Sequence, residues 1–196
     1  MLLLASSSTI RLTLLRNARV PVTSHPARID EFAIRQSLQT DHTSPRDIAD
    51  TLAEMKARKI AQLHPTALVL GCDQILALKD QVFERPTTPE QARDQLTRLR
   101  GQTHQLYSGL VLYHNAEPIW RHIGTAKLTM HSFSDAYLDG YISRQWPTIS
   151  RSVGAYQLES EGIRLFSAIE GDYFTILGLP LLPLLSYLSL RGFITT

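Results

Sequence analysis

The sequence has a single cysteine, Cys72, among its 196 residues. One cysteine cannot form an internal disulfide, and it leaves no Cys-X-X-Cys pair for a metal or redox motif. A chain without disulfides fits a reducing compartment. The opening Met-Leu-Leu-Leu-Ala lacks the basic residues and the apolar length of a signal peptide. We therefore expect a cytoplasmic protein.

Long apolar runs and concentrated charge are also missing. The most apolar stretch, 176–190, is interrupted by Gly178, Pro180 and Pro183 and is shorter than the roughly 20 residues that span a bilayer. Lysine and arginine number 20 against 18 acidic residues, and no run of five basic residues occurs. The composition therefore predicts neither a membrane span nor a nucleic-acid partner.

Several common catalytic and nucleotide-binding motifs are absent. The sequence contains no GxxxxGK[ST] phosphate loop, no GxGxxG fingerprint, no HExxH and no GxSxG. These absences exclude P-loop and Rossmann nucleotide sites, zincin-type metalloproteases and hydrolases with a nucleophile elbow.

Short apolar runs alternate with helical patterns, which is typical of an α/β fold with a mixed sheet. The length suits one large domain or two small lobes. Strands are expected at 1–5, 67–71, 75–78, 81–83, 104–114, 119–131, 154–156 and 163–169. Helices are expected at 10–18, 45–62, 89–100, 135–144 and 180–191, with irregular segments at 20–43 and 146–153.

The first candidate site is the junction between the first strand and the first helix. Ser6, Ser7 and Ser8 separate the two elements. A helix that starts after small hydroxylated residues presents free backbone N–H groups, which bind anions. The residues alone leave open that Ser7 or Ser8 merely caps the helix.

Four charged residues lie where a ligand could reach them. Asp73 follows a buried strand, where open α/β sheets place their ligands, although an aspartate there can simply turn the chain. Glu31 could hold a divalent cation through oxygen, or be a solvated loop acid. Lys56 lies on the apolar stripe of its helix and either reaches a buried anion or extends to solvent. Arg85, beside Pro86, could bind phosphate or lie in an exposed turn.

Taken together, a serine-rich helix start, two acids and three cations suit a nucleoside triphosphate with a divalent metal. The cations in this set are Arg11, Lys56 and Arg85. A metal neutralises the phosphates, and an acid can direct water at phosphorus.

The ordered set of motifs resembles the Maf family of nucleoside triphosphate pyrophosphatases, over nearly the whole chain. The motifs that carry the resemblance are Ala5-Ser6-Ser7-Ser8 with Arg11, Ile29-Asp30-Glu31, Lys56-Ala57, Gly71-Cys72-Asp73-Gln74, Leu99-Arg100-Gly101 with His104, Ser108-Gly109, Gly154-Ala155-Tyr156, Glu170-Gly171-Asp172-Tyr173 and Gly178-Leu179-Pro180-Leu181. Each motif alone is common, whereas their order along one chain is specific.

The resemblance implies one Maf-like domain over 1–196, a mixed α/β sheet flanked by helices, and two lobes around a central cleft. It implies a cytoplasmic and often dimeric enzyme. The implied activity is hydrolysis of a nucleoside triphosphate between the α and β phosphates, giving a monophosphate and pyrophosphate. Family members are associated with removing modified nucleotides and with septum formation.

The resemblance also assigns roles. Asp73 is implied as the catalytic acid that directs water. Glu31 and Asp73 are implied as ligands of Mg²⁺ or Mn²⁺. The residues implied to hold phosphates are Ser7, Ser8, Arg11, Lys56 and Arg85. Gln74 and Glu159 resemble the branch that prefers 7-methyl-GTP over dTTP and UTP, and a carboxylate suits a cationic methylated base.

Three departures from the family pattern leave an alternative open. A single arginine follows the serines, Arg85 stands where lysine is usual, and Arg151-Ser152-Val153 replaces Asp-Lys-Ala. Glu84 could replace the missing acid. The alternative is a catalytically weak or inactive nucleotide-binding regulator of cell division.

Overall fold

Prolines and capping side chains set the starts of the main helices in the computed structural model, which describes residues 1–195. Pro45 and Pro89 are the first residues of α3 and α4, and Ser44, Thr88 and Ser134 cap α3, α4 and α5. The helices are α1 Thr9–Asn17, α2 Glu31–Thr40, α3 Pro45–Leu63, α4 Pro89–Leu99, α5 Asp135–Gln145, α6 Tyr173–Ile176 and α7 Leu181–Leu190, with short 3-10 helices at Thr148–Arg151, Val153–Ala155 and Glu161–Leu165.

Within the described residues the strands form a mixed seven-stranded sheet. The strands are β1 Leu2–Leu4, β2 Val22–Ser24, β3 Leu68–Leu78, β4 Gln81–Phe83, β5 Thr103–His114, β6 Glu117–Met130 and β7 Phe166–Glu170. Their order is β2-β1-β3-β5-β6-β7, with β4 paired to β3. β1 runs parallel to β2 and β3, whereas the β3–β4 and β6–β7 pairs are antiparallel. The expected α/β class with a mixed sheet and flanking helices is confirmed.

The chain divides into two compact units. Unit 1 comprises Met1–Gln74, Tyr107–Thr125 and the chain from Asp172 onward, and unit 2 comprises Ile75–Leu106 and Ala126–Gly171. Strands β3, β5 and β6 each contribute residues to both units. Among the described residues, no helix has the length and apolar character that crossing a bilayer requires.

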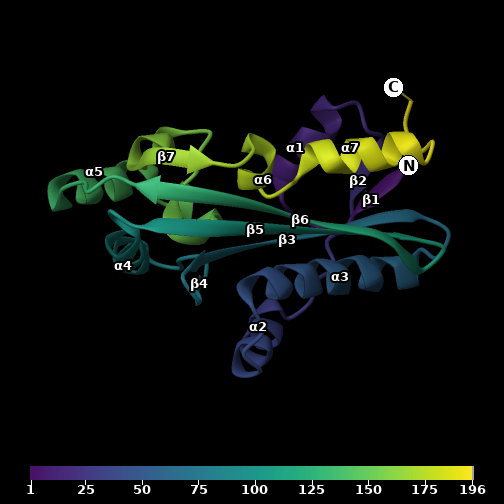
Figure 1. Cartoon of the computed structure of the whole chain (residues 1–196), viewed down its shortest axis with the longest axis horizontal. Helices are drawn as coiled ribbons and strands as arrows, with labels where there is room; N and C mark the ends of the chain where they lie inside the picture. Colours follow the sequence, from purple (N-terminus) through teal and green to yellow (C-terminus); the bar gives the residue numbers. More distant parts are fainter. Residues whose placement is uncertain (196) are drawn as a thin grey trace. The chain divides into compact units, whose positions relative to one another are not determined.

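Unit 1 has apolar packing on both faces of its strands. Successive strand residues point to opposite faces. Leu3, Val69 and Val111 pack with α3 on one face. The neighbouring residues along the same strands pack with α1 and α7 on the other face. Figure 1 shows α3 on one side of the unit 1 strands and α1 and α7 on the other. The alternation therefore assigns odd-numbered residues of β3 to the α3 face.

Helix α3 approaches the sheet unusually closely. A Cβ added to Gly71 would lie 2.0 Å from the Ala53 carbonyl oxygen, and one added to Gly109 would lie 2.7 Å from that of Ala49. The other helix atoms nearest that added Cβ are the backbone nitrogen and the Cβ of Ala57. Glycine in the strand and alanine on the helix therefore permit this contact, which brings the polar residues of α3 within reach of β3.

Several sequence expectations are wrong in detail. Residues 20–43 are not irregular, because they contain β2, which pairs with β1, and α2, which Asp30 caps. The 154–156 segment is not a strand: Gly154 and Ala155 have φ of 77° and 58°, which extended backbone does not adopt. β7 begins at Phe166, not at residue 163 as expected. β3 continues to Leu78 rather than ending at Gly71.

His104 is a buried polar residue of unit 2. Its ring is fully buried beside Tyr156 and Phe166, and Nε2 lies 2.8 Å from the Tyr156 hydroxyl oxygen. Its Nδ1 is buried without a hydrogen-bond partner. Burial lowers the pKa of His104 to about 4, so the imidazole is neutral at physiological pH.

This depressed pKa predicts a loss of stability in acid. Between about pH 6.5 and pH 4 the unfolded chain binds a proton at His104 and the folded chain does not, so the free energy of unfolding should fall by up to about 3 kcal/mol. Urea unfolding at pH 7 and pH 4.5 measures this loss. The His104→Gln variant should lose less stability over that interval, and the exposed control His131→Gln should behave as the parent chain does. An unchanged pH dependence in His104→Gln would exclude the assignment.

Candidate functional site

The candidate site begins where β1 ends and β3 continues. β1 pairs with β3 from Leu2 opposite Leu68 to Leu4 opposite Leu70, and the Ala5 N–H donates to the Leu70 carbonyl at 2.8 Å. The chain then turns through the serines into α1. β1 no longer borders β3 beyond Leu70. The Cys72 carbonyl on this edge of β3 therefore needs another hydrogen-bond partner.

Arg11 supplies that partner. Its NH1 group donates to the Cys72 carbonyl at 3.1 Å and to Ser6 Oγ at 3.3 Å, while Nε donates to the Gly178 carbonyl at 2.8 Å. The side chain is buried, at 6% exposure. Gly178 has φ of 86°, and a Cβ there would lie 3.0 Å from the guanidinium. Arg11 therefore binds backbone acceptors in this structure, and its contact with phosphate stays a prediction.

The serines have separate places at the start of α1. Ser8 is the N-cap residue, and its Oγ accepts from the Arg11 N–H at 3.4 Å. Ser6 is buried and its Oγ accepts from the Ser8 N–H at 3.2 Å, whereas Ser7 is exposed. The capping interpretation of Ser8 is confirmed. It does not exclude an anion at the helix start, since a cap satisfies only some of the terminal N–H groups.

Lys56 joins the two acids that the sequence analysis selected. Its ammonium lies 2.6 Å from Asp73 Oδ1 and 2.8 Å from Glu31 Oε1. The Lys56 and Asp73 side chains are 8% and 5% exposed, and Glu31 is 38% exposed. Of the two readings of Lys56, contact with a buried anion is correct and extension to solvent is wrong. Glu31 is not a loop acid but the first residue of α2.

Asp73 lies inside β3, on the face that α3 covers, and not past the end of the strand as expected. Its second oxygen, Oδ2, is buried and has no hydrogen-bond partner. A buried carboxylate oxygen without a donor is costly unless it serves a ligand. Asp73 therefore has one oxygen neutralised by lysine and one available for chemistry.

The two acids fit a divalent cation. Mg²⁺ prefers oxygen ligands and commonly binds one or two carboxylates together with waters and substrate phosphates. Glu31 and Asp73 supply two carboxylates that both contact the Lys56 ammonium. Asp73 Oδ2 has no partner and is available as a metal ligand. No cluster of three or more histidine, cysteine or acidic residues with metal-binding geometry occurs in residues 1–195, so such a cation would complete its coordination with substrate and water.

Neighbours of Asp73 on the strand face the opposite side. The Cys72 thiol is buried, and burial raises its pKa to about 11, so the thiol is unreactive at neutral pH. The Gln74 side chain contacts Ser108 and the backbone of Thr175 and Ile176. Ser108 and Asp172 belong to the sequence motifs, but the sequence predicted no role for either residue or for Thr175.

Arg85 and Glu159 belong to unit 2. Arg85 is exposed between β4 and α4, and Glu159 is exposed in the turn that follows Tyr156. The other sequence-predicted residues, Ser7, Ser8, Arg11, Glu31, Lys56, Asp73 and Gln74, all lie in unit 1. The roles of Arg85 and Glu159 stay predictions.

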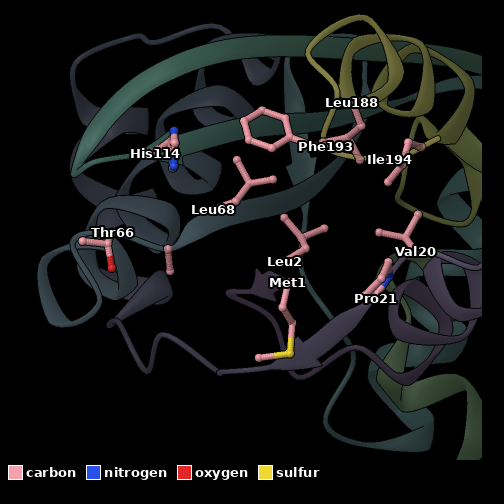
Figure 2. Close-up of a pocket in the computed structure, with 11 residues that line it drawn as sticks. Met1, Leu2, Val20, Pro21, Thr66, Leu68, His114, Leu188, Phe193 and Ile194 are labelled. Carbon is pink, nitrogen blue, oxygen red and sulfur yellow. The ribbon is translucent and has the colours of Figure 1, made fainter.

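A separate cavity of about 330 Å³ lies at the amino ends of β1 and β3 in unit 1. Figure 2 shows Leu2 and Leu68 among its lining residues, with Phe193 and Leu188 from the C-terminal segment. Thr66 and His114 supply its polar side chains. None of the candidate site residues lines this cavity.

The buried ammonium should be essential to the stability of the site. Lys56→Met would leave the buried Asp73 carboxylate unpaired, which should lower the free energy of unfolding by about 3 kcal/mol in urea titrations at pH 7. Lys59→Met, on the same helix but exposed, should change stability by less than about 0.5 kcal/mol. Equal effects of the two substitutions would contradict the ion pair.

Comparison with known proteins places this chain among relatives of nearly equal length. A nucleoside triphosphate pyrophosphatase of Ruegeria pomeroyi is 51% identical over 195 residues, covering 100% of this chain and 98% of the relative. One of the same name from Roseobacter denitrificans is 54% identical over 191 residues, covering 97% and 96%. A 7-methyl-GTP pyrophosphatase of Mesorhizobium japonicum is 47% identical over 191 residues, again covering 97% and 96%. The family described as Maf-like protein matches residues 1–190, and the chain therefore belongs to the Maf family.

Proposed function

We propose that this chain hydrolyses nucleoside triphosphates to a nucleoside monophosphate and pyrophosphate. The observation that carries the proposal is the Asp73 carboxylate, with one oxygen paired to Lys56 and the other buried without a partner. Relatives of nearly the same length named nucleoside triphosphate pyrophosphatase support the choice of reaction.

In the proposed reaction, Asp73 Oδ2 orients a water molecule and accepts its proton. The water oxygen forms a bond to the α phosphorus. The bond between that phosphorus and the oxygen bridging the α and β phosphates breaks, and pyrophosphate leaves. Lys56 holds the carboxylate in place, because its ammonium lies 2.6 Å from the other oxygen. The residue pair therefore provides a base that is held in one orientation.

Phosphate binding is proposed at the start of α1 and at three cationic side chains. The backbone N–H groups after Ser7 and Ser8 carry the partial positive charge of a helix N-terminus. Arg11, Lys56 and, from unit 2, Arg85 are the proposed cationic contacts. Mg²⁺ or Mn²⁺, held by Glu31 and Asp73, would neutralise phosphate charge when bound. The proposed substrate is a free nucleotide, with no nucleic acid or membrane partner, and a homodimer is proposed for the assembly.

The base is tested by Asp73→Asn, which keeps the shape of the side chain and removes its charge. Pyrophosphate release from a panel of nucleoside triphosphates, with Mg²⁺ or Mn²⁺, should fall by roughly 10²- to 10⁴-fold. Circular dichroism should show a retained fold, and the exposed control Asp80→Asn should keep full activity. Retained turnover in Asp73→Asn would remove this residue from the catalytic role. Tight nucleotide binding by the parent chain without turnover would instead favour a regulator.

We propose 7-methyl-GTP as a preferred substrate, with Gln74 and Glu159 as base-selecting residues. Relatives named 7-methyl-GTP pyrophosphatase support this choice. Attraction between a carboxylate and a cationic methylated base gives a physical reason. The chain should therefore have a higher kcat/KM for 7-methyl-GTP than for GTP, dTTP or UTP.

Glu159→Gln tests the charge contribution. It should reduce kcat/KM several-fold for 7-methyl-GTP and leave that for GTP nearly unchanged, because only the methylated base carries the positive charge. Glu117→Gln is the matched control, since Glu117 is also exposed but lies in unit 1. Absence of any preference for 7-methyl-GTP in the parent chain would refute the substrate assignment.

A further inference from the structure

Two histidine rings lie against each other at the C-terminal end of α3 in unit 1. The ring centroids of His25 and His64 are 5.2 Å apart, and the ring planes are inclined at 73°. His25 directly follows β2, where its N–H donates to the Leu4 carbonyl at 2.8 Å, and His64 is the C-cap residue of α3. The pairing of β2 with β1 and the end of a long helix therefore bring together two side chains that are far apart in the sequence.

The nitrogen atoms of both rings are available to a ligand. Neither imidazole forms a hydrogen bond or an ion pair with residues 1–195. His25 is half-buried and His64 is exposed, so dissolved ions can reach the pair. A neutral imidazole offers one nitrogen lone pair, and histidine is the commonest protein ligand of metal ions. The two rings therefore supply two ligand atoms that the fold itself does not use.

The separation of the rings matches that of two imidazoles on one metal ion. When two histidines bind a tetrahedral Zn²⁺ through nitrogen at about 2.0–2.1 Å, their ring centroids lie about 5 Å apart. The observed distance of 5.2 Å meets this condition. Simple edge-to-face packing of two rings gives a similar distance, of about 4.5–7 Å. Phenylalanine, which keeps the ring and lacks the nitrogen, separates these two explanations.

The end of α3 favours a cation at this position. The helix has 19 residues and carries no basic residue in its last turn. The last carbonyl groups of a helix have no partners within the helix and carry partial negative charge, which stabilises cations near the last turn. His64 caps this end, so a cation on its ring lies in the region where the field of the helix acts.

The chain that follows His25 is already held against α3. Ala27 is buried in one apolar cluster with Ile60 and Ala61 of the helix. The Lys59 ammonium donates to the Arg28 carbonyl at 2.8 Å. An ion that binds both histidines therefore has to order little of the chain, which lowers the free-energy cost of binding.

We propose that His25 and His64 form a surface site for Zn²⁺, separate from the carboxylate site proposed for Mg²⁺ or Mn²⁺. Imidazole nitrogen suits zinc, whereas Mg²⁺ prefers oxygen ligands. Residues 1–195 hold no cluster of three or more ligating side chains, so water completes the coordination. The bound ion cross-links α3, which carries Lys56, to the segment that leads from β2 to Glu31. The proposal does not depend on the proposed hydrolysis.

Zinc titration of the chain without an affinity tag tests the site. Isothermal titration calorimetry in excess Mg²⁺ should give a Kd for Zn²⁺. Imidazole ¹H–¹⁵N correlation spectra should show the His25 and His64 rings shifting on zinc addition, while the other histidines of the chain keep their positions. The spectra therefore identify the bound rings without any measurement of turnover.

Phenylalanine variants test whether the nitrogens bind the ion. His25→Phe and His64→Phe should each raise the zinc Kd about 10²-fold, because two linked ligands bind more tightly than one by at least that factor. The double variant should add little, since either change already removes the chelate. His131→Phe, at an exposed position, should keep the parent Kd. Glu31→Gln, which removes a proposed magnesium ligand, should also keep it. If His25→Phe does not fold, His25→Gln replaces it.

Three results would overturn the zinc site. They are no zinc binding by the parent chain, zinc binding that leaves both rings unshifted, and a Kd that is unchanged in the phenylalanine variants. The last result would assign the pair to ring packing alone. Failure of the parent chain to release pyrophosphate from any triphosphate would instead reject the proposed function, and it would leave a measured zinc Kd in place.

Discussion

The close approach of α3 to the sheet is the constraint on which the site depends. Gly71 and Gly109 leave room for the backbone of the helix, and Ala53 and Ala57 keep its facing surface small. At this separation the Lys56 ammonium can reach Asp73 on the strand without leaving the packed interface. A larger residue at either glycine position would require the helix to move away, and the charged contact would be lost together with the packing.

Three consecutive residues of β3 make three different kinds of contact. Their side chains alternate between the two faces of the sheet, and β1 no longer pairs with this part of the strand. The Cys72 carbonyl satisfies Arg11, the Asp73 carboxylate faces Lys56, and the Gln74 amide faces the α6 turn. A single extended segment thus presents a backbone group in the plane of the sheet and a side chain on each face. This geometry concentrates different chemistry within the length of three residues.

Local signals in the sequence were sufficient for much of the fold. Pro45 and Pro89 marked helix starts that the structure confirms, because proline and the capping residue before it act within one turn. The signals failed where distant partners decide the outcome. β2 has only three residues and depends on pairing with β1, and α2 buries none of its side chains. Asp30 was the local signal for the helix that starts at Glu31, but no buried face of that helix supported it.

The candidate site was predictable to a similar degree. Motif order brought Glu31, Lys56 and Asp73 onto one short list, and their ion pairs agree with that selection. The Gln74 contacts could not be inferred, because Thr175 lies 101 residues further along the chain. The left-handed backbone at Gly154 and Ala155 was also hidden, since an apolar run with a tyrosine is equally compatible with a strand.

The hydrogen bonds of the Arg11 guanidinium also affect the tendency of the chain to aggregate. An unpaired strand edge is a template onto which another extended chain can add, and this is a common route to aggregation. Here the Cys72 carbonyl already accepts a hydrogen bond from the buried Arg11 side chain, which also donates to the Gly178 carbonyl. A charged side chain that binds this carbonyl from within the fold therefore discourages intermolecular β-pairing at this position.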